Sequence, residues 1–259
     1  MLRAVDINFS IGKKQILKNI SVDFVPGEFA MILGPNGSGK SSFLKIFSGE
    51  TSKFNGDILY DNKRIGTIPK EALAKYRAVM SQQPELSFPL TVEEVILMGR
   101  YPHFNFSPAK KDIDICEEVM TRMNLRSFKA RNYITLSGGE KQRVQYARVL
   151  AQIWEKPATG CRYLFLDEPL NNLDISYQQE FLQVAKQFKT ENTVLVAVMH
   201  DINLAIQHAD KLVFFKDGEL VTAGKPKEIV NETLVAEVFN VKSTIITNPV
   251  TNQPLLIFN

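Results

Sequence analysis

The sequence predicts an α/β protein with a parallel core, an antiparallel N-terminal sheet and a helical insertion at roughly residues 85–150. Three patterns lead to this prediction. The first thirty residues alternate apolar and polar side chains in short stretches, as half-buried strands do. Apolar side chains recur at helical spacing between Ile113 and Met123. From Tyr163 onward, short apolar runs alternate with amphipathic stretches, which is typical of a parallel sheet covered by helices.

Individual elements follow from local signals. Residues 57–60 continue the strand character of the N-terminal region. Ser107 and Pro108 predict a helix that starts there, because serine is a common N-cap and proline fits the first helical position. A second helix is predicted from an apolar stripe, which consists of Ile175, Phe181, Leu182, Ala185 and Phe188.

The last part of the predicted core contains a buried strand and a hairpin. The continuous apolar run 193–199 is typical of a strand that is buried on both faces. Asp217 and Gly218 separate two short apolar runs and predict a tight hairpin turn.

The composition is that of an ordinary globular protein. The 259 residues are 44% hydrophobic and 23% charged. A net charge of +3 is too small to indicate nucleic acid as a partner. Cys116 and Cys161 lie far apart and lack metal-ligand spacing, so neither a disulfide framework nor a zinc site is indicated. The longest apolar run is far shorter than the roughly 20 residues that cross a bilayer.

Residues 34–41 match the phosphate-binding pattern G-x-x-x-x-G-K-[ST] in full. This phosphate loop follows an apolar run and precedes a helix-compatible run, which is the context that the pattern requires and which disfavours a chance glycine-rich turn. Lys40 would neutralise the β- and γ-phosphates, and Ser41 would offer its hydroxyl to Mg²⁺. The residues expected to bind the nucleotide here are Gly34, Pro35, Asn36, Gly37, Ser38, Gly39, Lys40, Ser41 and Ser42.

Two carboxylates follow the apolar run 163–166. In open α/β sheets ligands bind at the carboxyl ends of the strands, so Asp167 and Glu168 are expected at the site. Asp167 would hold Mg²⁺, and Glu168 would polarise the water that attacks the γ-phosphate. Acids that merely solvate a strand end are the alternative, and the phosphate loop upstream favours the functional interpretation.

Residues 136–143 read Leu-Ser-Gly-Gly-Glu-Lys-Gln-Arg. Ser137 and Glu140 predict a capping box at the start of a helix. The two glycines leave the helix N-terminus bare, so that its N–H groups could bind an anion. This signature segment is similar to the LSGGQ motif of ABC-type ATPases, with glutamate in place of the last glutamine.

The resemblance to ABC-type ATPases covers nearly the whole chain. It implies a P-loop NTPase core of the RecA-like type over residues 2–240, with a short C-terminal extension at 241–259. Gln82 resembles the glutamine that coordinates Mg²⁺ and the attacking water, and His200 resembles the switch histidine that contacts the γ-phosphate. Residues 171–174 resemble the family's D-loop, but two asparagines replace its usual small residues. Asp174 is expected near the nucleotide.

In this family an aromatic residue near the N-terminus often stacks on adenine. The matching position here is Ile11, and Phe9 could substitute for it. The resemblance further implies a head-to-tail homodimer in which ATP lies between the phosphate loop of one copy and the signature of the other. Ser137, Gly138, Gly139 and Glu140 would then contact ATP across the interface. Catalysis would depend on Glu168, His200, Gln82 and Lys40, and Mg²⁺ on Ser41, Gln82 and Asp167.

The implied partners are two copies of a membrane permease and, indirectly, a substrate-binding protein, with this chain at the cytoplasmic face of the cell membrane. A soluble ABC ATPase is the alternative, but it usually needs coiled-coil insertions, tandem cassettes or basic tails. A switch GTPase would need an N-K-x-D base reader, and residues 62–65 lack its aspartate.

The cargo is inferred from segments outside the nucleotide motifs. Residues 88–95 and 99–103 resemble the segment after the Q-loop in ATPases of metal-chelate importers. Residues 77–79 and 147–154 look most like those of hemin-importing subunits. The resemblance therefore implies heme as the cargo, with a ferric siderophore or cobalamin as alternatives.

Overall fold

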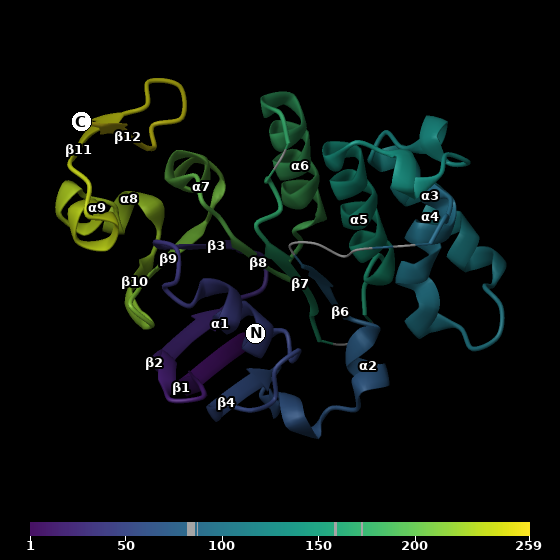
Figure 1. The fold of residues 1–259 in the computed structure, drawn as a ribbon, viewed down its shortest axis with the longest axis horizontal. Helices are drawn as coiled ribbons and strands as arrows, with labels where there is room; N and C mark the ends of the chain where they lie inside the picture. Colours follow the sequence, from purple (N-terminus) through teal and green to yellow (C-terminus); the bar gives the residue numbers. More distant parts are fainter. Residues whose placement is uncertain (82–85, 87, 158–159, 172) are drawn as a thin grey trace. The chain divides into compact units, whose positions relative to one another are not determined.

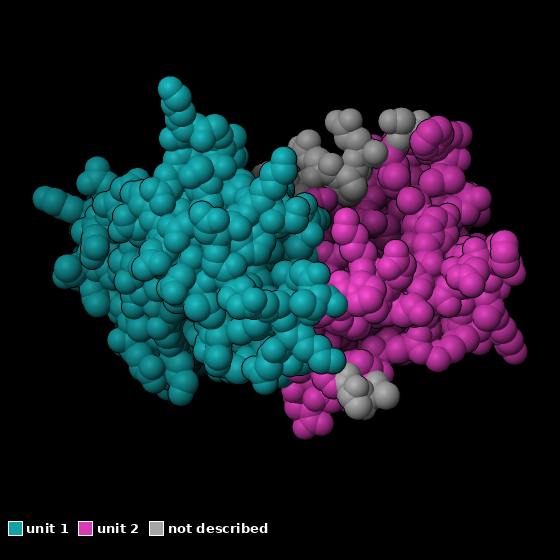
Figure 2. Space-filling view, turned by 90° about the horizontal axis from the view of Figure 1, so that it is seen from below, with its two compact units in different colours: residues 1–67, 194–259 teal, residues 68–193 magenta. Residues whose placement is uncertain are grey.

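The computed structural model describes residues 1–81, 86, 88–157, 160–171 and 173–259. The chain divides into a first unit, residues 1–67 and 194–259, and a second unit, residues 68–193. Figure 1 labels the elements, and Figure 2 colours the first unit teal and the second magenta.

The first unit contains the predicted antiparallel N-terminal sheet, in the order β2-β1-β4-β5. Its strands form because apolar side chains alternate along them, and Leu2, Ala4 and Ile7 of β1 are buried. The elements are β1 (Leu2–Ile11), β2 (Lys14–Phe24), β4 (Asn55–Tyr60), β5 (Lys63–Arg64) and the 3₁₀ helix η1 (Ile65–Thr67).

The first unit also contains parallel strands, in which β3 pairs with both β8 and β9. The predicted doubly buried strand is β8, whose six residues are all buried. The turn at Asp217 and Gly218 joins β9 to the antiparallel β10, as predicted. The elements are β3 (Phe29–Leu33), β8 (Thr193–Val198), β9 (Lys211–Lys216) and β10 (Glu219–Gly224).

Helices and a C-terminal hairpin complete the first unit (Figure 1). Asn203 joins the hairpin to α7, because its side chain exchanges two hydrogen bonds with the backbone of Leu256 at 2.9 and 3.0 Å. The elements are α1 (Lys40–Phe47), α7 (Ile202–His208), α8 (Pro226–Ile229), α9 (Glu232–Phe239), β11 (Ser243–Thr247) and β12 (Pro254–Phe258).

The second unit combines two parallel strands, β6 and β7, with most of the helices. Helix α5 has an apolar face that includes Val144, Ala147 and Leu150, all fully buried. The elements are α2 (Lys70–Ala74), β6 (Arg77–Met80), α3 (Val92–Leu97), η2 (Met98–His103), α4 (Lys110–Arg122), η3 (Arg126–Phe128), η4 (Tyr133–Thr135), α5 (Gly138–Gln152), β7 (Arg162–Asp167) and α6 (Ile175–Phe188).

Two details of the predicted helices are wrong. Helix α4 begins at Lys110, two residues after Pro108, because the Asp112 carboxylate accepts the Ala109 N–H at 3.0 Å and fixes the first turn there. On α6 the predicted stripe is buried except for Ile175, which is 78% exposed. Ile175 directly follows the N-cap, where a side chain has no preceding helical turn to pack on.

No helix within the described ranges is long and apolar enough to cross a membrane. Cys116 and Cys161 are both buried, and neither is in a disulfide. Burial raises the pKa of the Cys116 thiol to about 12.

Candidate nucleotide site

The phosphate loop lies between β3 and α1 and requires glycine at two places. Gly34 has a φ of 155°, and a Cβ there would lie 2.2 Å from the carbonyl oxygen of Phe215. Gly39 has a φ of 100°, and its Cβ would lie 2.7 Å from the Leu17 side chain. Any larger residue would clash at both positions. The curled backbone between β3 and α1 therefore requires glycine there.

The N-terminus of α1 has the features of an anion site. Its N-cap is Gly39, which has no side chain to bond the first N–H groups, and no acid lies in the first turn. The Oγ of Ser38 is buried and has no hydrogen-bond partner in the described part of the chain. A buried hydroxyl of this kind and a bare helix N-terminus both fit the oxygens of a phosphate group.

Lys40 is held over the same loop. Its side chain is only 5% exposed, and its Nζ donates to the carbonyl oxygens of Gly34 at 2.8 Å and Pro35 at 2.9 Å. The ammonium group is therefore fixed beside the loop backbone, and its predicted contact with phosphates stays a prediction.

His200 lies at the same edge of the sheet as the phosphate loop. Strands β3 and β8 are parallel, and the Met199 N–H donates to the Ile32 carbonyl at 3.0 Å, which extends their ladder. Asp201 caps α7 by accepting the Leu204 N–H at 2.9 Å, which fixes the backbone after His200. The first unit thus brings the loop and His200 to the carboxyl ends of adjacent strands.

The two candidates for adenine stacking lie on β1. Ile11 is the last residue of the strand and is 61% exposed. Phe9 is half-buried and pairs with Leu17, with a register shift on either side. Adenine stacking at these residues stays a prediction.

The second unit contains the acid pair. Asp167 ends β7 and is 6% exposed, and Glu168 follows with a φ of 52° in the left-handed region. We call residues 167–171 the acid turn. Met80 of β6 pairs with Leu166 of β7, so the chain that follows Met80 begins at the edge where the acid turn lies. Gln82 and Asn172 themselves lie outside the described residues.

The signature segment starts α5 as the capping box predicts. The Ser137 Oγ accepts the Glu140 N–H at 3.3 Å, and Glu140 Oε2 accepts the Ser137 N–H at 2.7 Å. The Ser137 N–H and the nearby Arg131 guanidinium, 3.3 Å away, hold the pKa of the Glu140 carboxyl below its usual range. A Cβ on Gly138 would meet nothing within 4 Å, so this helix start faces open space.

The signature helix and the acid turn are in direct contact in the second unit. Gln142 of α5 donates from Nε2 to the Pro169 carbonyl at 2.5 Å. The Asn171 amide donates to Glu168 Oε2 at 2.6 Å. Asp174, expected near the nucleotide, caps α6 by accepting the Tyr177 N–H at 3.0 Å.

Sequence reasoning missed the two amides that bond to the acid turn. The replacement of the family's small residues by asparagine was visible, but the reach of the Asn171 side chain to Glu168 was not. The Gln142 contact joins residues 27 positions apart, and no sequence pattern indicates it.

Ser41 and Asp167 are the described residues predicted to hold magnesium, and this role stays a prediction. Hydroxyl, carboxylate and amide oxygens suit Mg²⁺, which commonly takes one or two carboxylates together with substrate phosphates. In the described ranges no group of three or more His, Cys, Asp or Glu could hold a metal on its own.

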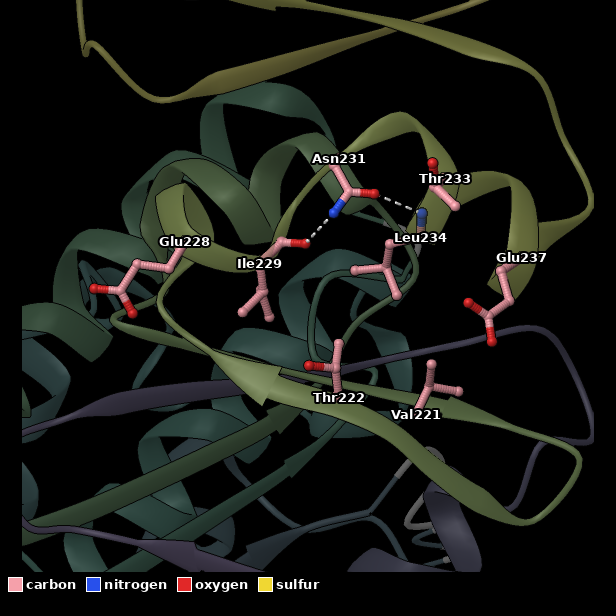
Figure 3. Close-up of a pocket in the computed structure, with 8 residues that line it drawn as sticks. All are labelled: Val221, Thr222, Glu228, Ile229, Asn231, Thr233, Leu234 and Glu237. Atoms are coloured by element: carbon pink, nitrogen blue, oxygen red, sulfur yellow. Dashed lines mark hydrogen bonds between the residues drawn. The ribbon is translucent and has the colours of Figure 1, made fainter.

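Another hollow of the first unit is lined by β10, α8 and α9 and has a volume of about 540 Å³ (Figure 3). Glu228 and Glu237 line it, together with Asn231, which caps α9. The two carboxylates would repel a phosphate, and the lining residues include no cation to offset them. None of the predicted site residues lies there. We therefore do not assign the nucleotide to this hollow.

Comparison with known proteins decides the family. The sequence profile described as ABC transporter matches residues 17–171. The chain belongs to the ABC transporter family. The predicted α/β fold of the ABC ATPase type and the predicted activity, ATP hydrolysis coupled to transport, are thereby confirmed.

Two relatives match this chain over nearly its whole length, and two solved structures share its fold. The hemin import ATP-binding protein HmuV of Gloeobacter violaceus is 39% identical over 257 residues, 99% of this chain and 94% of that protein. HmuV of Escherichia coli O157:H7 is 35% identical, with 100% of both chains covered. The dimeric bacterial ABC transporter cassette MJ0796 has a TM-score of 0.73 and 27% identity, covering 87% of this chain and 98% of that one. An ABC transporter in an inward-facing conformation shares the fold with a TM-score of 0.80, 22% identity and coverage of 100% and 96%.

Proposed function

We propose that this ABC transporter ATPase powers the import of hemin through a separate membrane permease, at the cytoplasmic face of the cell membrane. The cargo assignment is supported by full-length identity of 35–39% to proteins named for hemin import. The energy source is supported by the phosphate loop, where a bare helix N-terminus and the buried Lys40 ammonium lie together.

The chemistry follows from the residues that surround the γ-phosphate in this proposal. Backbone N–H groups of the loop and Lys40 hold the phosphates, and His200 contacts the γ-phosphate from the adjacent strand. Water attacks the γ-phosphorus, its proton passes to the Glu168 carboxylate, and the bond to the ADP oxygen breaks with its electron pair on ADP. Ser41, Asp167 and Gln82 would hold Mg²⁺, which supplies charge neutralisation on the phosphates.

Two copies of the chain would complete one site. The MJ0796 cassette was solved as a dimer, and we propose a head-to-tail homodimer here as well. ATP would lie between the phosphate loop of one copy and Ser137, Gly138, Gly139 and Glu140 of the other. The nucleotide's negative charge would join two anion-binding helix ends, and hydrolysis would release them.

An aromatic hollow of the second unit is the surface that we propose for the permease. It has a volume of about 470 Å³ and includes Tyr101, which is 58% exposed, and Phe106, which is fully exposed. Exposed aromatic side chains of this kind are enriched at protein interfaces. The contact would be to apolar side chains of the permease.

The segment that presents these aromatics is firmly held. Arg100 is 1% exposed and donates to Asp112 at 3.0 Å, to the Ala151 carbonyl at 2.8 Å and to Glu155 at 2.7 Å. Ala151 lies in the last turn of α5, whose first turn is the signature segment. A displacement of the aromatic hollow by the permease would therefore be transmitted along α5 to the signature segment.

The test is uptake by vesicles that contain this chain and its cognate permease with the substrate-binding protein. We expect ATP-dependent uptake of heme, and its loss in the Glu168→Gln variant, which should still bind ATP. Uptake of a ferric siderophore or of cobalamin but not of heme would contradict the cargo. Undiminished ATP hydrolysis by Glu168→Gln would contradict the role of Glu168.

A further inference from the structure

The acid turn contains a hydrogen bond that the proposed mechanism does not use. Strand β7 ends at Asp167, and the left-handed backbone of Glu168 reverses the chain. The Asn171 N–H then donates to the Glu168 carbonyl at 3.3 Å, and the Asn171 side chain donates from Nδ2 to Glu168 Oε2 at 2.6 Å. The same two residues are therefore joined through both backbone and side chains.

The surroundings hold Asn171 in this position. Leu170 within the turn and Leu173 after it are 8% and 7% exposed, so apolar side chains on both sides of Asn171 are buried in the second unit. The Gln142 side chain bonds the Pro169 carbonyl, and Gln178 of α6 donates to the Leu173 carbonyl at 3.1 Å. Because the backbone is fixed at both ends, the amide can bond Glu168 at little further cost in conformational entropy.

We propose that Asn171 is a positioning residue that orients the Glu168 carboxylate for the attacking water. This inference rests on the proposed role of Glu168 as the base. An amide Nδ2 is a donor without acceptor capacity, so it can fix the carboxylate without competing for the proton of water. Each carboxylate oxygen has two lone pairs, so the hydrogen bond leaves acceptor capacity for water.

The position explains why the family's usual small residue would not serve in the same way. The asparagine amide reaches Glu168 Oε2 at 2.6 Å, and a shorter side chain such as serine would place its hydroxyl closer to the backbone and farther from this oxygen. The asparagine of this chain thus adds an orienting contact from a position three residues after the candidate base.

The main variant is Asn171→Asp, which keeps the shape of the side chain but removes the Nδ2 donor. We expect kcat for ATP to fall at least tenfold while KM stays within about twofold, because the orienting donor is lost and the new carboxylate also repels that of Glu168. Asn171→Ala lacks the donor without adding a charge, so its expected fall of about tenfold in kcat measures the orienting contact alone, and it also serves if Asn171→Asp does not fold. The matched control is Gln178→Ala, which removes another amide bond to the same loop, and its kcat should stay within about twofold.

A double variant separates positioning from general damage. In single-turnover assays, Glu168→Gln with Asn171→Ala should hydrolyse ATP at the same residual rate as Glu168→Gln alone, because the carboxylate that Asn171 orients is gone. If the Asn171 substitution lowers the rate of Glu168→Gln by the same factor as it lowers the rate of the parent protein, the proposal is overturned. So would a kcat of either Asn171 variant within twofold of the parent, while loss of turnover in Glu168→Gln would leave the proposed function standing. Full turnover in Glu168→Gln would instead overturn both.

Discussion

Helices α1 and α5 begin in opposite ways, although both starts are proposed to contact the phosphates of ATP. Helix α1 begins after Gly39, with no capping side chain and no acid in its first turn. Helix α5 begins after Ser137, with a complete capping box and Glu140 in its first turn. The first helix start is therefore prepared for an anion, and the second already satisfies part of its own N–H groups.

This difference indicates two distinct tasks. A bare N-terminus with a buried lysine beside it would bind ATP within one copy. A capped N-terminus with a carboxylate gains less from a phosphate, because some of its N–H groups already have partners and Glu140 repels negative charge. The signature would then contribute conditionally, only when ATP is already held by the other copy. Such weak and reversible closure suits a cycle in which the dimer must open again.

The largest expected effect is on the α1 side. Lys40→Ala should weaken ATP binding to the isolated chain about a hundredfold, because a buried charge beside the phosphates is lost. Lys45→Ala is the matched control, since it removes the same charge from the exposed side of the same helix. Titration with a fluorescent ATP analogue measures both, and equal affinities for the two variants would contradict a phosphate role for Lys40.

Much of this comparison could be predicted from the sequence. The phosphate loop pattern and the S-x-x-E box are local, so they indicated both helix starts and the capping of α5 correctly. The predicted start of α4 was wrong. The hydrogen bond from the Ala109 N–H to the Asp112 carboxylate fixes the first turn, and the serine–proline pair does not. A local pattern therefore predicts a helix start correctly when, as at Ser137 and Glu140, the residues of the pattern are also the residues that cap the helix.

Contacts between distant residues could not be predicted in this way. Phe215 approaches Gly34 from another strand, and only the fold shows why glycine is required there. The bond from Asn171 to Glu168 spans three residues, but it depends on the left-handed backbone of Glu168, which sequence does not indicate for a glutamate. The roles of the site residues, Gln82 among them, stay predictions.

A smaller effect is expected on the α5 side. Glu140→Gln should tighten the ATP-dependent dimer about fivefold, because glutamine can still accept the Ser137 N–H while the repulsion of phosphate is lost. The experiment is done in the Glu168→Gln background, so that ATP is not consumed, and sedimentation gives the dimer dissociation constant. Glu191→Gln, an exposed residue of the same unit, controls for net charge. A dimer that is weakened by Glu140→Gln would show that the carboxylate helps to bind ATP.

The smallest effect concerns the cap itself and its dependence on pH. The folded pKa of Glu140 is lowered from the usual 4.5, first by the Ser137 N–H, so the charged carboxylate stabilises the fold at pH values above 4.5. This contribution is lost as the pH falls through the lower folded pKa. Because Glu140 is near the surface, solvent screens the charge, and the contribution should be less than about 1 kcal/mol.

Denaturant unfolding of the parent and of Glu140→Gln between pH 6 and pH 3 measures this contribution. The parent's advantage in unfolding free energy should shrink towards acid pH, while the similar cap of Thr91 and Glu94 is present in both proteins and cancels. If the difference in unfolding free energy between the parent and Glu140→Gln is constant with pH, the stability of the α5 cap does not depend on the charge of Glu140. The two helix starts would then differ only in whether their N–H groups are capped.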